Sequence, residues 1–159
     1  MLDEPGRGRL EAAYRSLGDD LWRAIVAYSG GSRDVADEAV AEAFAQAARG
    51  LGRIRDLRPW LFRAAFRIAA GELKRRGATP IGDPENRRAD DGGTEEMTEM
   101  MELVHTLSPA QRRAFVLRDL LGYPTSEAAT LAGSSEVSVR VHLHAARRRL
   151  RIQLEEAAR

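Results

Sequence analysis

Two clusters of arginine and lysine side chains are the residues of this sequence with the clearest potential chemistry. The first lies in segment 58–76, where Glu72 is the only acidic residue, and comprises Arg58, Arg63, Arg67, Lys74, Arg75 and Arg76. The second lies in segment 140–151, which has no acidic residue, and comprises Arg140, Arg147, Arg148, Arg149 and Arg151. Such cations bind phosphate groups. A solvated helix face is the alternative for each cluster taken by itself.

Aromatic side chains are interleaved with the first cluster, at Trp60, Phe62 and Phe66. Because aromatic rings stack on unpaired bases while cations hold the phosphates, the segment predicts a site for an opened nucleic-acid strand. The expected contacts are Trp60, Arg63, Phe66, Arg67 and Lys74. Core packing is the alternative for two of the three rings.

The sequence offers little for catalysis. It has no phosphate-binding glycine loop, no HExxH motif, no nucleophile with an evident base and no cysteine. His142 and His144 point about 200° apart on a helix of ~3.6 residues per turn, so they cannot share a metal ion. His105 is interpreted as a helix-end residue. We therefore expect no catalytic residue, no metal site and no cofactor.

Composition sets the class of protein. With 159 residues, of which 43% are hydrophobic and 31% charged, the chain is expected to fold into one or two small domains. Few aromatic residues and many Ala and Arg residues favour helices. The N-terminus is charged where a signal peptide is apolar, and no apolar run approaches the ~18 residues of a membrane span. We expect a cytoplasmic, all-α protein with no membrane partner.

Helical periodicity runs through the first half of the chain. Residues 9–29 form one amphipathic helix that a Gly-Gly pair ends. Ser32 or Asp34 caps a second helix, whose apolar stripe of mostly small residues permits close packing. Pro59 lies in the first turn of a third helix that runs to about Arg76.

The composition then changes in segment 77–94. Its sequence, which includes GATPIGDPENRRADDGG, has Pro-containing breaks and turn dipeptides and almost no apolar residues. This predicts a flexible linker between two small helical domains, residues 1–76 and 95–159. Helix signals resume at the capping residue Thr94, and residues 108–111, SPAQ, carry the strongest local helix start in the chain.

The last helix requires a choice between two periods. Within EVSVRVHLHAARRRLR, residues 136–151, the first half alternates like a strand. The apolar positions Val139, Leu143, Ala146, Leu150 and Leu154 then follow steps of four and three, which only a helix produces. Ser135 is its expected N-cap. With the short helix 125–131 before it, this segment predicts a helix-turn-helix whose second helix enters the DNA major groove.

These motifs together resemble the extracytoplasmic-function (ECF) group of bacterial RNA polymerase sigma factors. LSPAQRRAFVLRDLLGYPTSEAATLAGSSEVSVRVHLHAARRRLR follows the family's reader of the upstream (−35) promoter element without a gap. VADEAVAEAFAQA resembles the helix that grips the polymerase, and RPWLFRAAFRIAAGELKRR the helix that reads and melts the −10 element. The resemblance covers nearly the whole chain. It implies core RNA polymerase and promoter DNA as partners, and leaves open an anti-sigma protein.

The resemblance also implies positions for the contacts. For core polymerase binding they are Asp37, Glu38, Ala41 and Glu42. For the −10 element they are the aromatic and basic residues of segment 60–74 named above. For the −35 element they are Ser135, Glu136, Val137, Ser138, Arg140, Val141, His144, Arg147 and Arg148.

Several positions depart from the family pattern. Val141, His142 and Ala145 stand where a serine-like residue and two arginines are usual, so apolar side chains face the expected groove. Phe66 and Arg67 replace a common Arg-Asn pair. The alternative hypothesis is therefore a sigma-like DNA-binding regulator or interaction protein without full initiation activity. A clamp helix followed by a melting helix favours a working sigma factor.

Overall fold

The computed structural model describes residues 2–77 and 95–159, and all regular structure within these ranges is helical. The N-terminal group consists of α1 (Glu4–Tyr28), α2 (Arg33–Arg49), the 3₁₀ turn η1 (Leu51–Arg53) and α3 (Leu57–Arg75). The C-terminal group consists of α5 (Glu95–Val104), α6 (Pro109–Phe115), the π-helical turn η2 (Val116–Leu120), α7 (Thr125–Ala132) and α8 (Glu136–Ala157). The all-α class is confirmed. The linker predicted at 77–94 lies outside the described residues except for Gly77.

The first helix begins earlier than its periodicity predicted, and side-chain caps explain the starts of α1 and α3. α1 begins at Glu4 rather than at residue 9, because Asp3 accepts a hydrogen bond from the Gly6 amide at 2.8 Å. α3 begins at Leu57, where the Asp56 side chain accepts from the Arg58 amide at 3.3 Å, so Pro59 lies in the first turn as predicted. Both caps precede proline, a residue that the first helical turn tolerates. Ser32 rather than Asp34 caps α2.

The three helices of the N-terminal group pack on one another through small and aromatic side chains. The small residues Ala36, Ala39, Ala43 and Ala47 line the buried face of α2. Because these side chains are short, α1 and α3 approach α2 closely. Leu21, Ile25 and Tyr28 of α1 and Phe62 and Phe66 of α3 fill the space between the helices.

In the C-terminal group, both halves of the predicted capping box at the start of α6 form. The Ser108 hydroxyl accepts from the Gln111 amide, and the Gln111 side chain accepts from the Ser108 amide. One continuous helix was expected up to Gly122. Instead α6 widens into η2, where the Leu121 amide donates to the Val116 carbonyl, five residues back.

The helix-turn-helix forms as expected. α7 ends at Gly133, whose φ of +71° allows the sharp turn into α8. Ser135 caps α8 by accepting from the Ser138 amide. The buried face of α8 consists of Val139, Leu143, Ala146 and Leu150. These positions confirm the helical interpretation of the segment with the mixed pattern.

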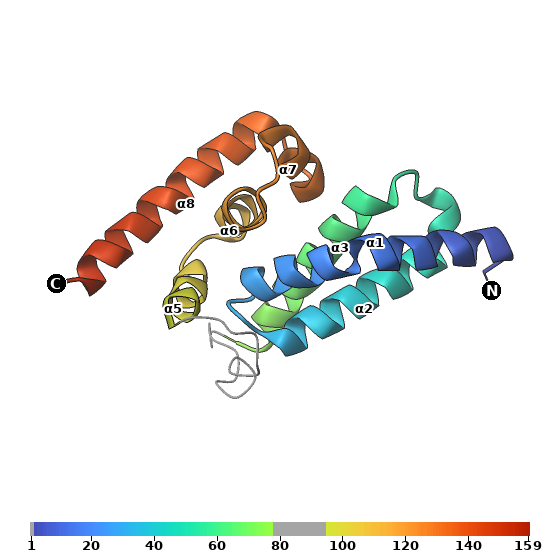
Figure 1. The fold of residues 1–159 in the computed structure, drawn as a ribbon, viewed down its shortest axis with the longest axis horizontal. Coiled ribbons are helices and arrows are strands. Elements are labelled where there is room, and N and C mark those ends of the chain that lie inside the picture. The colour runs from blue at the N-terminus through green and yellow to red at the C-terminus, as the bar shows by residue number, and fades with distance from the viewer. Residues whose placement is uncertain (1, 78–94) are drawn as a thin grey trace.

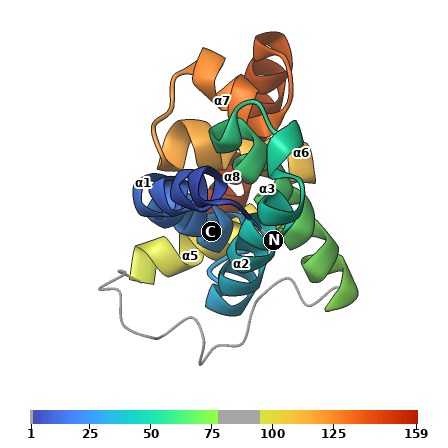
Figure 2. The same ribbon diagram turned by 90° about the vertical axis from the view of Figure 1, so that its right-hand side faces the viewer.

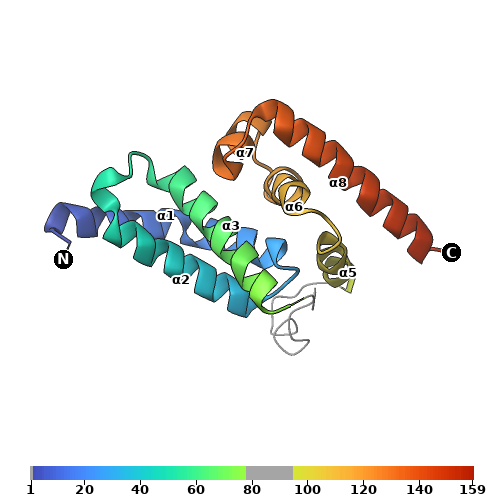
Figure 3. The ribbon, with the colours of Figure 1, turned by 180° about the vertical axis from the view of Figure 1, so that it is seen from behind.

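The two groups of helices share one continuous buried core. α7 covers the N-terminal half of α3, while α1 contacts η2 and α5 (Figures 1 and 2). α8 lies on the side remote from α1–α3, with α6 and α7 between, and its C-terminus is at the opposite end of the molecule from the N-terminus (Figure 3). Of the two basic helices, α8 is therefore at the outside and α3 is partly covered.

Candidate nucleic-acid interface

The outward face of α8 carries apolar and cationic side chains. Val137 is 66% and Val141 59% exposed, although both are large hydrophobic residues. His144 and Arg148 continue the same face, one and two turns further along the helix, and are also exposed. This face lies opposite the buried stripe, so it is the face that a bound duplex can reach.

The serines and the acidic residue at the start of α8 are occupied locally. The Ser135 hydroxyl accepts from the Ser138 amide at 3.1 Å and lies 3.0 Å from the Ser138 hydroxyl. Glu136, in the first turn, forms a loose ion pair with Arg140 at 3.8 Å. Arg140 is exposed. It is therefore more available than Arg147, which lies two turns further along the same flank of α8.

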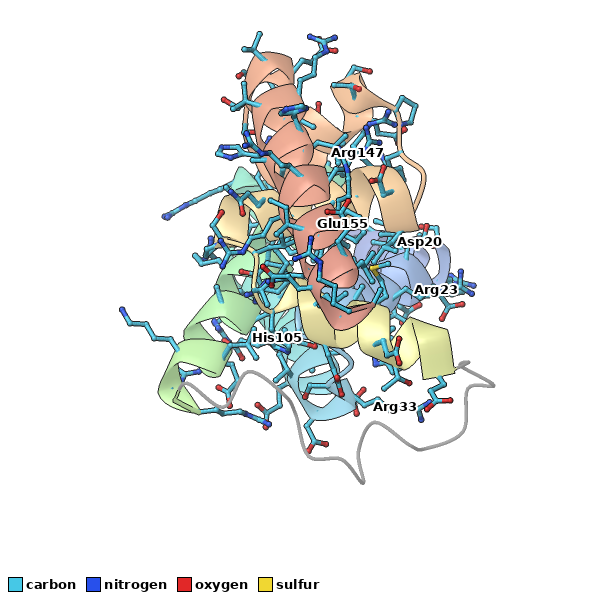
Figure 4. All side chains as sticks on the ribbon, turned by 90° about the vertical axis from the view of Figure 1, so that its left-hand side faces the viewer. Asp20, Arg23, Arg33, His105, Arg147 and Glu155 are labelled. Atoms are coloured by element: carbon cyan, nitrogen blue, oxygen red, sulfur yellow. The ribbon has the colours of Figure 1, made fainter. Side chains whose placement is uncertain are left out.

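Arg147, the other arginine of that flank, is held by the protein. Its Nε and Nη2 donate to Asp119 Oδ2 and Oδ1 at 2.8 and 2.6 Å, a bidentate pair that links α8 to η2. The hydrogen bonds to Asp119 raise the pKa of the guanidinium. Figure 4 shows Arg147 midway along α8. The sequence predicted Arg147 as a contact to the −35 element but did not predict this pair.

Phe66 differs from its expected place. It is only 2% exposed and packs edge-on against Tyr28, with ring centroids 5.3 Å apart. It lies four residues from the buried Phe62 and three from the buried Ala69, so it shares their core-facing side of α3. The expectation that Phe66 covers a base is wrong for this conformation. Trp60, which is half-buried, is the ring on this helix that remains in partial contact with solvent.

Arg63, Arg67 and Lys74 are exposed on α3, but two of them have partners. The Arg63 guanidinium donates from Nε and Nη2 to the Thr130 carbonyl at 3.2 and 3.0 Å. Thr130 belongs to the last turn of α7, whose carbonyls carry the negative end of the helix dipole. Arg67 Nη2 donates to Gln46 Oε1 of α2 at 3.1 Å.

The contact between α3 and α7 includes residues that sequence reasoning did not single out for this purpose. Arg58 pairs with Glu127 at 2.5 Å and lies over the Tyr123 ring, 5.2 Å from its centroid. Tyr123 packs edge-on against Phe62 and donates its hydroxyl to Asp20 of α1 at 3.3 Å. No local pattern predicts these pairs, because the partners are far apart along the chain. Arg58 is 69 positions from Glu127 and 65 from Tyr123, and Tyr123 is 61 positions from Phe62 and 103 from Asp20.

Electrostatics in this contact follow from partial burial. Burial is the largest single effect on Arg58 and lowers its pKa, but the hydrogen bonds and charge attraction of Glu127 and Tyr123 together outweigh it, so the pKa is raised. Burial, followed by the nearby Asp20 carboxylate, raises the pKa of the Tyr123 hydroxyl. Both groups therefore keep their ordinary protonation states at neutral pH, Arg58 charged and Tyr123 neutral.

The two groups of helices also contact each other around Arg112 of α6. Its guanidinium donates to the carbonyls of Tyr28, His105 and Leu107 and lies 5.1 Å from the centroid of the Tyr28 ring. Burial lowers the pKa of Arg112 from its very high ordinary value. His105 packs directly on Gly30 of the α1–α2 turn, where a Cβ atom would lie 1.9 Å from His105 Nε2. Only glycine fits at this approach.

The edge of α2 expected to face polymerase is exposed at all four positions, Asp37, Glu38, Ala41 and Glu42. Three of them have partners. Asp37 accepts from the Trp22 indole at 2.8 Å, and Glu38 lies 3.5 Å from Arg76. The Gln46 amide and Arg49, by hydrogen bonding to Glu42, lower the pKa of its carboxyl group. The edge is thus an anionic surface held in place by neighbouring side chains.

Among the described residues, no group of three or more His, Asp or Glu side chains is arranged to hold a metal ion. No helix in the same part of the chain is both long and apolar enough to cross a membrane.

Comparisons with known proteins agree on one family. Residues 97–150 match the family described as sigma-70, region 4. The chain is 31% identical over 160 residues to the probable RNA polymerase sigma-C factor of Mycobacterium bovis, covering 89% of this chain and 82% of that protein. The same values hold for the ECF RNA polymerase sigma factor SigC of Mycobacterium tuberculosis.

Two solved structures share the fold. CnrH in complex with the cytosolic domain of CnrY superposes with a TM-score of 0.68 and 22% identity, covering 94% of this chain and 90% of that one. The sigma factor RpoE in complex with the anti-sigma factor NepR from Bartonella quintana superposes with a TM-score of 0.69 and 18% identity, covering 91% and 96%.

Proposed function

This chain belongs to the ECF group of RNA polymerase sigma factors, and we propose that α2, α3 and α8 divide the work of promoter recognition. As a sigma factor it binds core RNA polymerase and directs transcription initiation at promoters. The family is one of non-catalytic transcription factors, so the polymerase supplies the chemistry and this chain contributes no catalytic residue. Its place of action is the cytoplasm, with the polymerase.

The observation that carries this proposal is the presence of two basic helices in one chain, one in a helix-turn-helix and one beside an anionic helix edge. An ordinary DNA-binding regulator needs only the first. Residues 95–159 form the domain that reads the −35 element through the exposed side of α8, and residues 1–76 form the domain that serves the −10 element and the polymerase.

Strand opening falls to α3 in this proposal. Arg63, Arg67 and Lys74 hold the backbone of the non-template strand, and Trp60 covers an unstacked base. Extruding a base costs a few kcal/mol, which stacking and phosphate contacts offset. Phe66 supports the helix from inside the core.

Opening requires a rearrangement between α3 and α7. Arg63 donates from Nε and Nη2 to the Thr130 carbonyl and Arg58 pairs with Glu127, so α7 already occupies part of the donor groups of both guanidinium groups in this conformation. We therefore propose that α7 leaves α3 when the chain binds polymerase. Both fold neighbours are bound by a partner protein, CnrH by the cytosolic domain of CnrY and the sigma factor RpoE by the anti-sigma factor NepR. An anti-sigma protein that keeps α7 packed on α3 is a compatible regulator of this chain.

The acidic edge of α2, formed by Asp37, Glu38, Ala41 and Glu42, is the proposed surface for core polymerase. Its carboxylates are exposed, and they are oriented by Trp22, Arg76, Gln46 and Arg49. Oriented charges of this kind steer association and fix the register of an interface.

The decisive experiment reconstitutes this chain with purified core polymerase from a close relative of the source organism. Genomic fragments of that relative that the complex binds are selected and then used as templates for transcription. Specific transcripts that depend on this chain are expected. Binding to DNA without any transcript, or without any complex with core polymerase, would instead identify a regulator that has kept the fold.

A further inference from the structure

Two exposed valines at the start of α8 have no structural role within the described part of the chain. Val137 and Val141 are 66% and 59% exposed and lie one helical turn apart on the outward face. The same helix buries Val139, Leu143, Ala146 and Leu150 on its opposite face. The core of the helix-turn-helix is therefore complete without the two valines.

The surroundings of the valines match a duplex rather than an apolar partner. Arg140 lies on the flank of the pair, and Arg148 lies two to three turns along on the same face. Glu136 is the single carboxylate in the first four turns of α8, and Arg140 pairs with it. An apolar pair bordered by cations fits a polyanion that presents an apolar group between its phosphates.

The DNA major groove presents one such group, the C5-methyl of thymine. In a helix-turn-helix the N-terminal turns of the second helix contact the base edges, and Val137 and Val141 lie in the first two turns of α8. Four residues of helix advance by about 6 Å. Successive bases of one strand are about 3.4 Å apart along the duplex, so the two valines reach bases that are about two steps apart along the groove.

We propose that Val137 and Val141 are specificity-determining residues that contact the methyl groups of two thymines about two base steps apart, with one base between them, in the −35 element. The inference rests on the proposed function of α8 and specifies what it reads. Such an apolar contact reads thymine without a hydrogen bond, in contrast to the bidentate hydrogen bonding by which arginine reads guanine. The promoters of this sigma factor therefore carry thymines on one strand at the upstream site.

The test begins with selection from a randomised duplex library by the full-length chain bound to core polymerase. Each thymine of the selected −35 site is then replaced by deoxyuridine, which keeps every hydrogen-bonding group and removes only the methyl. Two positions are expected to lose about fourfold in affinity each, the equivalent of one buried methyl or methylene group. The remaining thymines are expected to be insensitive.

Valine variants connect each methyl to its side chain. Val141→Ala is expected to bind thymine and deoxyuridine duplexes equally at one of the two positions, and Val137→Ala at the other. Ile152→Ala removes a 45% exposed apolar side chain further along α8 and serves as the matched control, with thymine discrimination unchanged. Because all three side chains are exposed, helical content measured by circular dichroism should not change.

The possible outcomes are distinguishable. A selected −35 site that lacks thymines, or whose deoxyuridine forms bind equally well, overturns the inference while leaving the sigma-factor function intact. Discrimination that persists in both alanine variants overturns it as well. If the valine variants lose affinity for a protein partner while DNA selection is unchanged, the pair is a protein contact. Failure of the complex to form or to select any duplex contradicts the proposed function itself.

Discussion

The outward face of α8 and the exposed face of α3 are both basic, but they differ in how far their side chains are available. On α8, Val137, Val141 and Arg148 face solvent. On α3, Arg63 and Arg67 have acceptors in α7 and α2. The number of positive charges does not distinguish the two helices. What distinguishes them is whether another part of the chain supplies an acceptor at the same place.

The comparison implies an order of events. The exposed side chains of α8 can meet duplex DNA directly, whereas Arg63 must leave the Thr130 carbonyl before its whole guanidinium can bind a strand. In the proposed function, α8 can therefore read the −35 element while α7 still packs on α3, whereas strand opening by α3 requires α7 to move away.

The largest expected effect comes from Phe66→Ala, since this ring lies in the core rather than on the DNA face. Truncating a buried phenylalanine costs about 3–5 kcal/mol of unfolding free energy. Trp60→Ala, at a half-buried ring, should cost less and should still impair strand opening. Urea unfolding of both variants, with permanganate reactivity of unpaired thymines as the functional readout, separates the two roles. Equal stability of Phe66→Ala and the parent would contradict the core assignment.

Removing the cation of Arg63 should impair opening more than binding. A hydrogen bond to a charged group contributes about 1.5–3 kcal/mol, so permanganate reactivity with Arg63→Ala should fall by roughly tenfold or more at a subsaturating promoter concentration. Arg53→Ala removes an exposed arginine outside this face and is the control. Normal opening by Arg63→Ala would remove the assigned strand contact.

Charge reversal on α2 tests the third surface. Glu38→Lys combined with Glu42→Lys should weaken association with core polymerase by about tenfold, because the anionic edge proposed to steer association then becomes cationic. Both side chains are exposed, so helical content should stay the same. Co-purification and fluorescence anisotropy measure the affinity. An unchanged value would place the polymerase contact elsewhere on the chain.

Weakening the contact between α3 and α7 should make the cations of α3 more available to nucleic acid, as the exposed side chains of α8 already are. Glu127→Gln removes the charge opposite Arg58, and a partly exposed ion pair is worth about 0–1 kcal/mol, so the gain should be at most about fivefold. It is measured as affinity of the free chain for a single-stranded −10 oligonucleotide. Glu4→Gln removes a charge remote from this contact and controls for net charge. A gain of equal size in that control would mean that the contact between α3 and α7 does not restrain α3.

The smallest difference is expected within α8, between the two arginines of one flank. Arg140→Ala should lower affinity for promoter duplex and reduce the slope of log affinity against log salt by roughly 0.9, as for the loss of one phosphate contact. Arg147→Ala should change the slope less, because Asp119 already holds this guanidinium. The two slopes can be measured by titration at several salt concentrations. A larger change at Arg147 would mean that DNA displaces Asp119.

Local signals in the sequence determined most of the helices and their buried faces. The capping box of Ser108 and Gln111 and the cap of Ser135 act over three residues, so they can be recognised without the fold. The spacing of Val139, Leu143, Ala146 and Leu150 likewise predicted which side of α8 is buried. The start of α1 was missed because Pro5, Gly6 and Gly8 interrupt the pattern, although Asp3 supplies a cap.

Only the tertiary structure decided which functional side chains are available. Phe66 could be assigned to the core or to DNA until Tyr28, 38 positions away, was placed against its ring. The guanidinium groups of Arg63 and Arg147 look equally free in the sequence, yet their acceptors, the Thr130 carbonyl and the Asp119 carboxylate, come from positions 67 and 28 residues away. Helical period depends on neighbours three and four residues apart, whereas these hydrogen bonds depend on how whole helices pack.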